Sequence, residues 1–197
     1  AASQTASTAA DAPTTSTVTR PHGIAQRVPW TSSRILGTPE PPSPYLLERA
    51  FPKIEFNKPV DICAAPGSDR FFVMEERGKI YSFPNRRDAE TPDLFFDLKK
   101  SIPGVQSAYG IIFHPGFETN RYVYLCYVLK ENLKDGSRVS RFSVTRSDPP
   151  RIDPVSETIL ITWLSGGHNG GCLKFGADGC LYISTGDGAG PNPPDSL

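Results

Sequence analysis

The stretch IIFHPGFETNRYVYL, residues 111–125, decides how this chain folds. It reads as an apolar strand, then a turn rich in Pro, Gly and Asn, then a second and strongly apolar strand. The same order occurs twice more, in ICAAPGSDRFFVM (62–74) and LKFGADGCLYI (173–183). When Gly67, Gly116 and Gly176 serve as markers, the three copies are 49 and 60 residues apart. A repeated group of strands at about this interval is typical of β-propeller blades.

Short runs rich in β-branched and aromatic residues predict ten strands around these openings. They fall into a group at 59–64, 71–75, 79–83 and 94–98, a group at 109–114, 122–129, 138–145 and 158–164, and a third that begins at 171–175 and 180–185. The sequence therefore predicts an all-β protein with about two and a half propeller blades. A plain β-sandwich is the alternative, because its strands also alternate with turns.

The two ends of the chain differ from this pattern. Residues 1–19 contain nine Ser or Thr, six Ala and no aromatic residue, and PEPPSP at 39–44 favours an extended polyproline-like linker. We therefore expect a disordered leader and Pro-rich linker at 1–50 and a partial propeller at 51–197. Because a propeller needs at least about four blades to close, we expect these residues to be the N-terminal portion of a longer protein.

Composition excludes several classes of function. Lys plus Arg and Asp plus Glu number 21 each, so the charge balance gives no case for binding nucleic acid or a charged membrane. No apolar run is long enough to span a membrane. The four cysteines form no CxxC motif. If Phe175 pairs with Cys180, then Cys172 and Cys180 face opposite sides of the hairpin, which predicts buried free thiols and no disulfide.

Two residues that could carry chemistry flank the predicted last hairpin. His168 precedes it and Asp187 follows it, and a hairpin brings its two ends together. An imidazole titrates near neutral pH and can accept a proton, and a carboxylate can stabilise the resulting charge. The alternatives are a loop histidine, an aspartate that caps a turn, or a metal site that adds Cys172 and Cys180. His114 and Asp178 are expected to have turn and packing roles.

Further short motifs occur in a fixed order along the chain: YGIIFHPGF (109–117), NRYVY (120–124), RVSRF (138–142), HNGG (168–171), FGADG (175–179) and LYISTGDG (181–188). Together they resemble the soluble glucose/sorbosone dehydrogenase family over about residues 57–190. Members of that family are sugar dehydrogenases that depend on pyrroloquinoline quinone (PQQ) and have a six-bladed propeller. The HNGG to TGDG block is the most specific part of the resemblance.

The resemblance implies that a sugar passes hydride to PQQ while His168 takes the hydroxyl proton and Asp187 orients and stabilises the imidazole. It also places Gln106 and Asn169 near the cofactor, although Gln106 fits the family pattern only with a gap. The Ca²⁺ ligands and the cationic residues that hold PQQ are expected beyond residue 197. The resemblance also implies a sugar substrate, an electron acceptor such as a cytochrome, and a periplasmic or extracellular location. The alternative is a non-catalytic extracytoplasmic propeller that binds a carbohydrate or a protein.

Overall fold

The computed structural model describes residues 45–188, so residues 1–44 of the predicted leader and linker (1–50) and residues 189–197 lie outside it. All described strands belong to one compact unit, which begins at Leu47. Within the described residues, no helix is both long and apolar enough to cross a bilayer.

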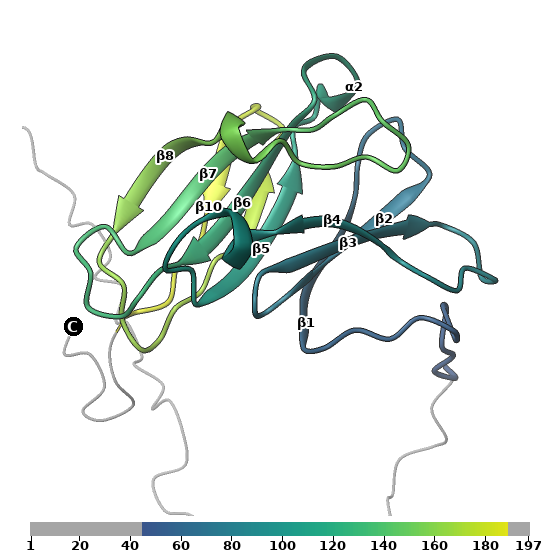
Figure 1. The fold of residues 1–197 in the computed structure, drawn as a ribbon, viewed down its shortest axis with the longest axis horizontal. Coiled ribbons are helices and arrows are strands. Elements are labelled where there is room, and N and C mark those ends of the chain that lie inside the picture. Colours follow the sequence, from purple (N-terminus) through teal and green to yellow (C-terminus); the bar gives the residue numbers. More distant parts are fainter. Residues whose placement is uncertain (1–44, 189–197) are drawn as a thin grey trace, which may run out of the picture. The chain divides into compact units, whose positions relative to one another are not determined.

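The compact unit contains two four-stranded antiparallel sheets and a two-stranded hairpin (Figure 1). The first sheet, blade 1, has the order β1 (Pro59–Ala64), β2 (Arg70–Glu75), β3 (Lys79–Pro84) and β4 (Asp93–Asp97). Blade 2 has the order β5 (Ser107–Phe113), β6 (Tyr122–Val128), β7 (Ser137–Ser143) and β8 (Thr158–Trp163). The hairpin pairs β9 (Leu173–Phe175) with β10 (Leu181–Ile183). Three single-turn helices link the strands: α1 (Leu98–Ser101), α2 (Phe117–Asn120) and the 3₁₀ turn η1 (Pro154–Ser156).

All ten predicted strands are present, and each end lies within two residues of its predicted position. Every strand in a blade pairs with the next strand along the chain, which is the meander of a propeller blade and not the Greek key of a sandwich. The prediction of two blades and the opening of a third is confirmed, and the sandwich alternative is wrong.

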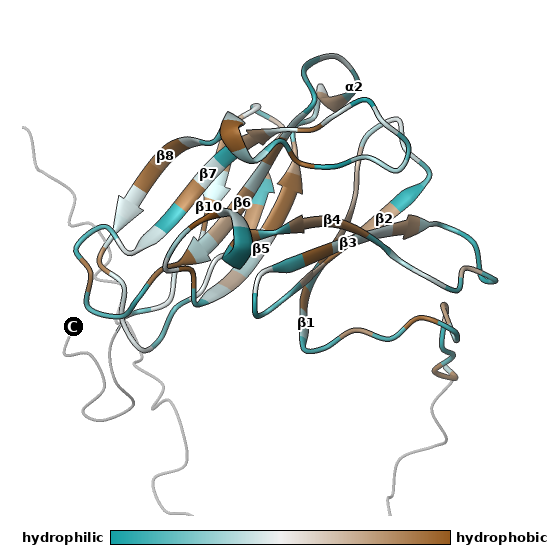
Figure 2. Ribbon diagram, in the orientation of Figure 1, coloured by the Kyte–Doolittle hydropathy of each residue, from teal (hydrophilic) through white to brown (hydrophobic). Residues whose placement is uncertain are grey.

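Strand β6 shows why an apolar run becomes the centre of a blade. Successive side chains of a strand point to opposite faces, and both faces of YVYLCYV are covered. Val123, Leu125 and Tyr127 join the core between the two blades. Tyr124 and Cys126 point the other way and pack on the hairpin. Figure 2 shows hydrophobic, brown segments on β6, while many of the turns are teal.

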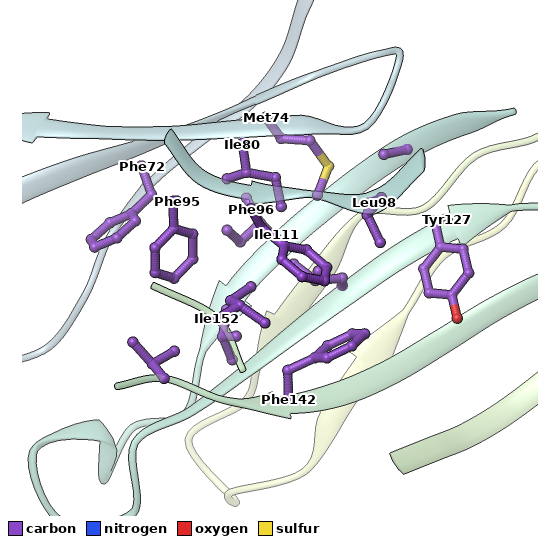
Figure 3. Packing of buried hydrophobic residues seen from close by; sticks show 14 of the residues in the cluster. Phe72, Met74, Ile80, Phe95, Phe96, Leu98, Ile111, Tyr127, Phe142 and Ile152 are labelled. Carbon is purple, nitrogen blue, oxygen red and sulfur yellow. The ribbon is translucent and has the colours of Figure 1, made fainter. Parts of the chain in front are cut away.

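The largest core lies between blade 1 and blade 2, whose side chains point toward each other (Figure 3). Phe72 of β2 meets Phe113 of β5 with ring centroids 4.5 Å apart, and Phe95 of β4 lies 4.7 Å from Phe72. Fully burying one such ring stabilises the fold by roughly 1.5–3 kcal/mol. Packing of this kind fixes blade 2 between blade 1 and the hairpin.

The inner strands of the two blades, β1 and β5, are joined by the side chain of Asp61. Asp61 of β1 lies beside a register shift, where its Oδ1 accepts a hydrogen bond from the N–H of Ile62 at 2.9 Å. Its Oδ2 accepts a hydrogen bond from the N–H of Ile111 in β5 at 3.0 Å. Strand β5 in turn lies beside β9, with Gly110 against the backbone of Gly171. The inner strands β1, β5 and β9 are therefore successive neighbours.

Candidate functional site

The hairpin at the end of the described chain is held by its turn. Asp178 accepts hydrogen bonds from the N–H of Cys180 at 3.0 Å and from the hydroxyl of Tyr182 at 2.9 Å. The bond from the Cys180 N–H, helped by the one from Tyr182, lowers the pKa of the Asp178 carboxyl. The N–H of Gly176 donates to the carbonyl of Cys180 at 2.9 Å. The structural role predicted for Asp178 agrees with these bonds.

The pairing within the hairpin differs by one residue from the expected one. Leu181, not Cys180, lies opposite Phe175. A slip of one residue exchanges the two faces of a strand, so the argument that Cys172 and Cys180 face opposite sides does not hold. Both thiols are free, as predicted, but both are exposed and not buried. The cause is that each lies just outside the short strands, where no neighbouring sheet covers it.

The hairpin brings His168 and Asp187 together. Nδ1 of His168 lies 3.1 Å from Oδ1 of Asp187. The backbone supports this contact, because the N–H of Gly188 donates to the carbonyl of His168 at 2.9 Å. Two residues that are 19 positions apart in the sequence therefore form one unit at the end of the hairpin.

The contact between His168 and Asp187 contributes little to the stability of the fold. The two side chains are 46% and 48% exposed, and an ion pair in such a position contributes only about 0–1 kcal/mol. When Nδ1–H donates to the carboxylate, Nε2 carries the lone pair that can accept a proton. An imidazole and a carboxylate at this distance can act as a general base and its orienting partner.

Asn169 holds the loop that carries His168. Its Nδ2 donates to the carbonyl of Gly166 at 2.7 Å, and its Oδ1 accepts a hydrogen bond from the N–H of Gly166 at 3.3 Å. Gly166 lies tightly against the other loop, since a Cβ there would meet the carbonyl oxygen of Gly188 at 1.9 Å. Only glycine permits this approach of the two loops. Both ends of the Asn169 amide thus bind the chain's own backbone.

A pocket of about 280 Å³ lies beside the pair. Its lining consists of Trp163, Leu164, His168, Asn169, Gly186, Asp187 and Gly188. The lining combines apolar and polar residues, as in many sites for small molecules. Trp163 is not among the site residues expected from the sequence. The available signal was its position at the end of β8, directly before the loop that carries His168.

Gln106 does not line this pocket. It is exposed, and its N–H donates to the carbonyl of Val128 at 2.9 Å, directly before β5 begins. Ser107 pairs with Val128, Val128 with Ser137, and Ser137 with Trp163. Gln106 and Trp163 therefore lie at the same end of blade 2, separated by three strand spacings of about 4.8 Å each. Within the described residues, no group of three metal-ligating side chains could hold a metal ion, so His168 and the two exposed cysteines do not form the alternative metal site.

The sequence profile of the glucose/sorbosone dehydrogenase family matches residues 56–197. The chain belongs to this family. Hedgehog-interacting protein from Homo sapiens and its counterpart from Mus musculus are each 29% identical to it over 137 residues, which are 62% of this chain and 19% of each relative. The chain thus spans about a fifth of the length of these curated relatives.

Solved structures show that the glucose/sorbosone dehydrogenase fold is shared. The PQQ-bound aldose sugar dehydrogenase from Streptomyces coelicolor is 20% identical, with a TM-score of 0.58 over 74% of this chain and 42% of that one. A glucose dehydrogenase is 18% identical, with a TM-score of 0.52 over 66% of this chain and 38% of that one. Both identities are low, so these likenesses establish the fold alone.

The described residues of this glucose/sorbosone dehydrogenase family member fit part of a PQQ site. PQQ is a quinone that carries carboxylates, so its site needs a base for the substrate and cations for the cofactor. His168 and Asp187 suit the first need. The pocket lining includes neither Lys nor Arg, so none of its described residues meets the second need.

Proposed function

We propose that the chain is part of a PQQ-dependent sugar dehydrogenase. The observation that carries this proposal is the contact of 3.1 Å between Nδ1 of His168 and Oδ1 of Asp187 beside a pocket lined by apolar and polar residues. Membership of the glucose/sorbosone dehydrogenase family supports it. The exposure of both side chains also supports it, because an exposed ion pair contributes little to stability.

His168 is the general base of the proposed reaction. Its Nε2 accepts the proton of a sugar hydroxyl, and the carbon that bears this hydroxyl loses a hydride and becomes a carbonyl. PQQ, when bound, supplies the acceptor for that hydride. Asp187 keeps the proton of neutral His168 on Nδ1 and stabilises the imidazolium that forms. Asn169 holds the loop in place through Gly166, and contact of Gln106 or Asn169 with the cofactor is part of the proposal.

The remaining parts of the proposed function follow from the family. The substrate is an aldose or a sorbosone-like sugar, and a separate electron acceptor such as a cytochrome reoxidises the cofactor. Ca²⁺ binds beside PQQ through ligands beyond residue 197. The protein works in the periplasm or outside the cell, where PQQ-dependent sugar oxidation takes place.

A second candidate function is that of a non-catalytic propeller that binds a protein or a carbohydrate. The observation that favours it is the name of the curated relatives, Hedgehog-interacting protein, which describes binding and not oxidation. The pocket lining without Lys or Arg agrees with this candidate as well. Cationic side chains that reach the pocket from later blades would favour the dehydrogenase instead.

PQQ binding and turnover test the first candidate. The natural protein that contains these residues is titrated with PQQ and Ca²⁺ by absorbance, and dye reduction is followed with a panel of aldoses. We expect PQQ binding in the wild type and in His168→Ala, and sugar-dependent dye reduction that falls by roughly 10²–10⁴-fold in the variant, the range of general-base catalysis.

His114→Gln is the matched control, because it also removes a histidine ring, but one that does not line the pocket. This variant should keep full dye reduction per folded molecule. A folded protein that binds no PQQ would exclude the dehydrogenase and favour the binding module. Equal activity of His168→Ala and the wild type would remove His168 from the reaction.

A further inference from the structure

Ser165 joins the loop that carries His168 to a different part of blade 2. It lies three residues before His168 and is fully buried. Its hydroxyl donates to the carbonyl of Lys130 at 2.7 Å and accepts a hydrogen bond from the N–H of Leu133 at 3.0 Å. A buried hydroxyl with this many partners is expensive to remove, since each partner is left without its bond.

The backbone of Ser165 adds two further bonds to the same segment. Its N–H donates to the carbonyl of Leu133 at 3.0 Å, and its carbonyl accepts a hydrogen bond from the N–H of Asn132 at 3.0 Å. Lys130, Asn132 and Leu133 belong to the loop between β6 and β7, which lies at the same end of blade 2 as His168. Both the hydroxyl and the backbone of one residue therefore tie the two loops together.

The loop between β6 and β7 is shaped to receive this serine. A Cβ on Gly136 would lie 2.2 Å from Oγ of Ser165 and 2.7 Å from its Cβ, far inside van der Waals contact. Gly136 itself is buried, and its N–H donates to the carbonyl of Leu133 at 3.0 Å. The fit leaves no room for a side chain at position 136.

The contacts continue from Ser165 to the imidazole. Gly166 follows Ser165 directly and is bound at both its N–H and its carbonyl by the amide of Asn169. His168 lies between these two residues in the sequence, and its own carbonyl accepts a hydrogen bond from Gly188. We propose that Ser165 is a positioning residue that sets the place of His168 relative to Asp187 through this loop. The expected effect of Ser165 on catalysis rests on the proposed function, but its expected effect on the position of the His168 imidazole does not.

The test therefore measures the environment of the His168 imidazole and the catalytic rate separately. The chain has three histidines, so the ring signals of His168 and His114 can be resolved by NMR with ¹⁵N-labelled histidine. In Ser165→Ala we expect the ring shifts of His168 to change while those of His114 stay as in the wild type. In the full protein with PQQ, we expect kcat to fall roughly 10- to 100-fold with little change in KM, because small misplacements of a catalytic group are costly.

Ser137→Ala is the matched control. Ser137 is also a fully buried serine of blade 2, but its hydroxyl has no hydrogen-bond partner among the described residues. Its removal should leave the ring shifts of His168 and the value of kcat unchanged. The same ring shifts for His168 in folded Ser165→Ala as in the wild type would overturn the proposal, whether or not the protein oxidises sugars.

A second variant covers the case in which Ser165→Ala does not fold, which would be seen as loss of the His114 signals as well. Gly136→Ala pushes on Ser165 from the other loop and leaves the serine in place. We expect it to change the His168 ring shifts in the same way. Unchanged His168 shifts in folded Gly136→Ala would contradict a positioning role for this contact.

Discussion

Two histidines lie at opposite ends of the neighbouring strands β5 and β9, and the structure uses their side chains differently. His114 follows β5 directly, and its Nδ1 accepts a hydrogen bond from the N–H of Gly116 at 2.9 Å. Its ring lies 5.3 Å from Phe175, the last residue of β9, and 6.3 Å from Tyr124. His114 thus closes a turn and packs on a core.

His168 lies before the first residue of β9, at the other end. Its Nδ1 meets a carboxylate instead of a backbone amide, and its ring lines a pocket instead of stacking on aromatic residues. The contrast shows that the partner of Nδ1 distinguishes the packing role of His114 from the proposed role of His168 as a base. An N–H from the backbone uses up the lone pair of Nδ1, whereas a carboxylate favours the proton there and frees the lone pair of Nε2.

Among the variants that test this contrast, loss of the Asp187 carboxylate should have the largest effect. In Asp187→Asn we expect kcat for sugar oxidation to fall by roughly 100-fold or more, because an amide neither fixes the tautomer of His168 nor stabilises its charged form. Steady-state kinetics of the PQQ-loaded protein measure this. Asp178→Asn, in the turn of the same hairpin, is the control and should keep its activity. Activity of Asp187→Asn equal to that of the control would contradict the distinction between the two histidines.

Loss of the other histidine should act on stability. In His114→Ala we expect the free energy of unfolding to fall by about 1–3 kcal/mol, because a hydrogen bond and two aromatic contacts are lost. Urea unfolding followed by fluorescence measures this difference. The exposed His168 should cost less than about 1 kcal/mol when replaced by alanine. Equal losses of stability in the two variants would show that the structural role does not separate them.

The rate of thiol labelling at Cys126 should report how well the loop that carries His168 covers this cysteine. Cys126 is buried beneath this loop, with its Sγ 3.7 Å from the carbonyl of Gly170, and burial raises its pKa to about 12. Because the thiolate is the reactive form, we expect Cys126 to react at pH 8 roughly 100-fold more slowly than the exposed Cys172 and Cys180. Mass spectrometry after alkylation measures the rates. Asn169→Ala should speed the labelling of Cys126, and His114→Gln should not.

The same raised pKa has a consequence for stability. The buried Cys126 stays protonated in the folded protein, while the exposed thiol of the unfolded chain ionises above its ordinary pKa of 9.0. The contribution of this group is therefore fully present below about pH 9 and is lost as the pH rises toward 12. Replacement of Cys126 by serine should remove this part of the decline in stability at alkaline pH. A decline of the same size in Cys126→Ser would assign it to other groups.

The turn of the hairpin should give the smallest effect. In Asp178→Ala we expect a decrease in Tm of a few degrees at most and an unchanged kcat, because the carboxylate bonds only within the exposed turn. Since its pKa is lowered in the folded state, the contribution of Asp178 is present above its unfolded pKa and is lost as the pH falls through its folded pKa. Calorimetry at neutral and acidic pH measures this. A large loss of activity would mean that the turn, and not only its two ends, shapes the site.

The strands could be predicted because each one is a short apolar run with turn residues on both sides, and β6 shows this most clearly. The meeting of His168 with Asp187 could be predicted because a hairpin returns to its starting edge. The register of that hairpin could not, since Phe175 has two similar neighbours across the turn, Cys180 and Leu181, and the bonds of Asp178 decide between them. Ser165 could not be found either, because its partners lie more than 30 residues away in another loop.

The contact between the inner strands β1 and β5 has a consequence for how propeller proteins evolve. Blade 1 and blade 2 share no ladder of main-chain bonds, and the carboxylate of Asp61 links β1 to the N–H of Ile111. A blade that meets its neighbour in this way keeps its own ladder complete when that neighbour is exchanged. The sheet is then a unit of duplication and recombination, and a new copy can be received by an apolar face and a few hydrogen bonds, such as those from the N–H of Ile111 to Asp61 and from the N–H of Ala108 to the carbonyl of Glu76. Genes for such proteins can grow by whole blades, with selection acting mainly on the surface between them.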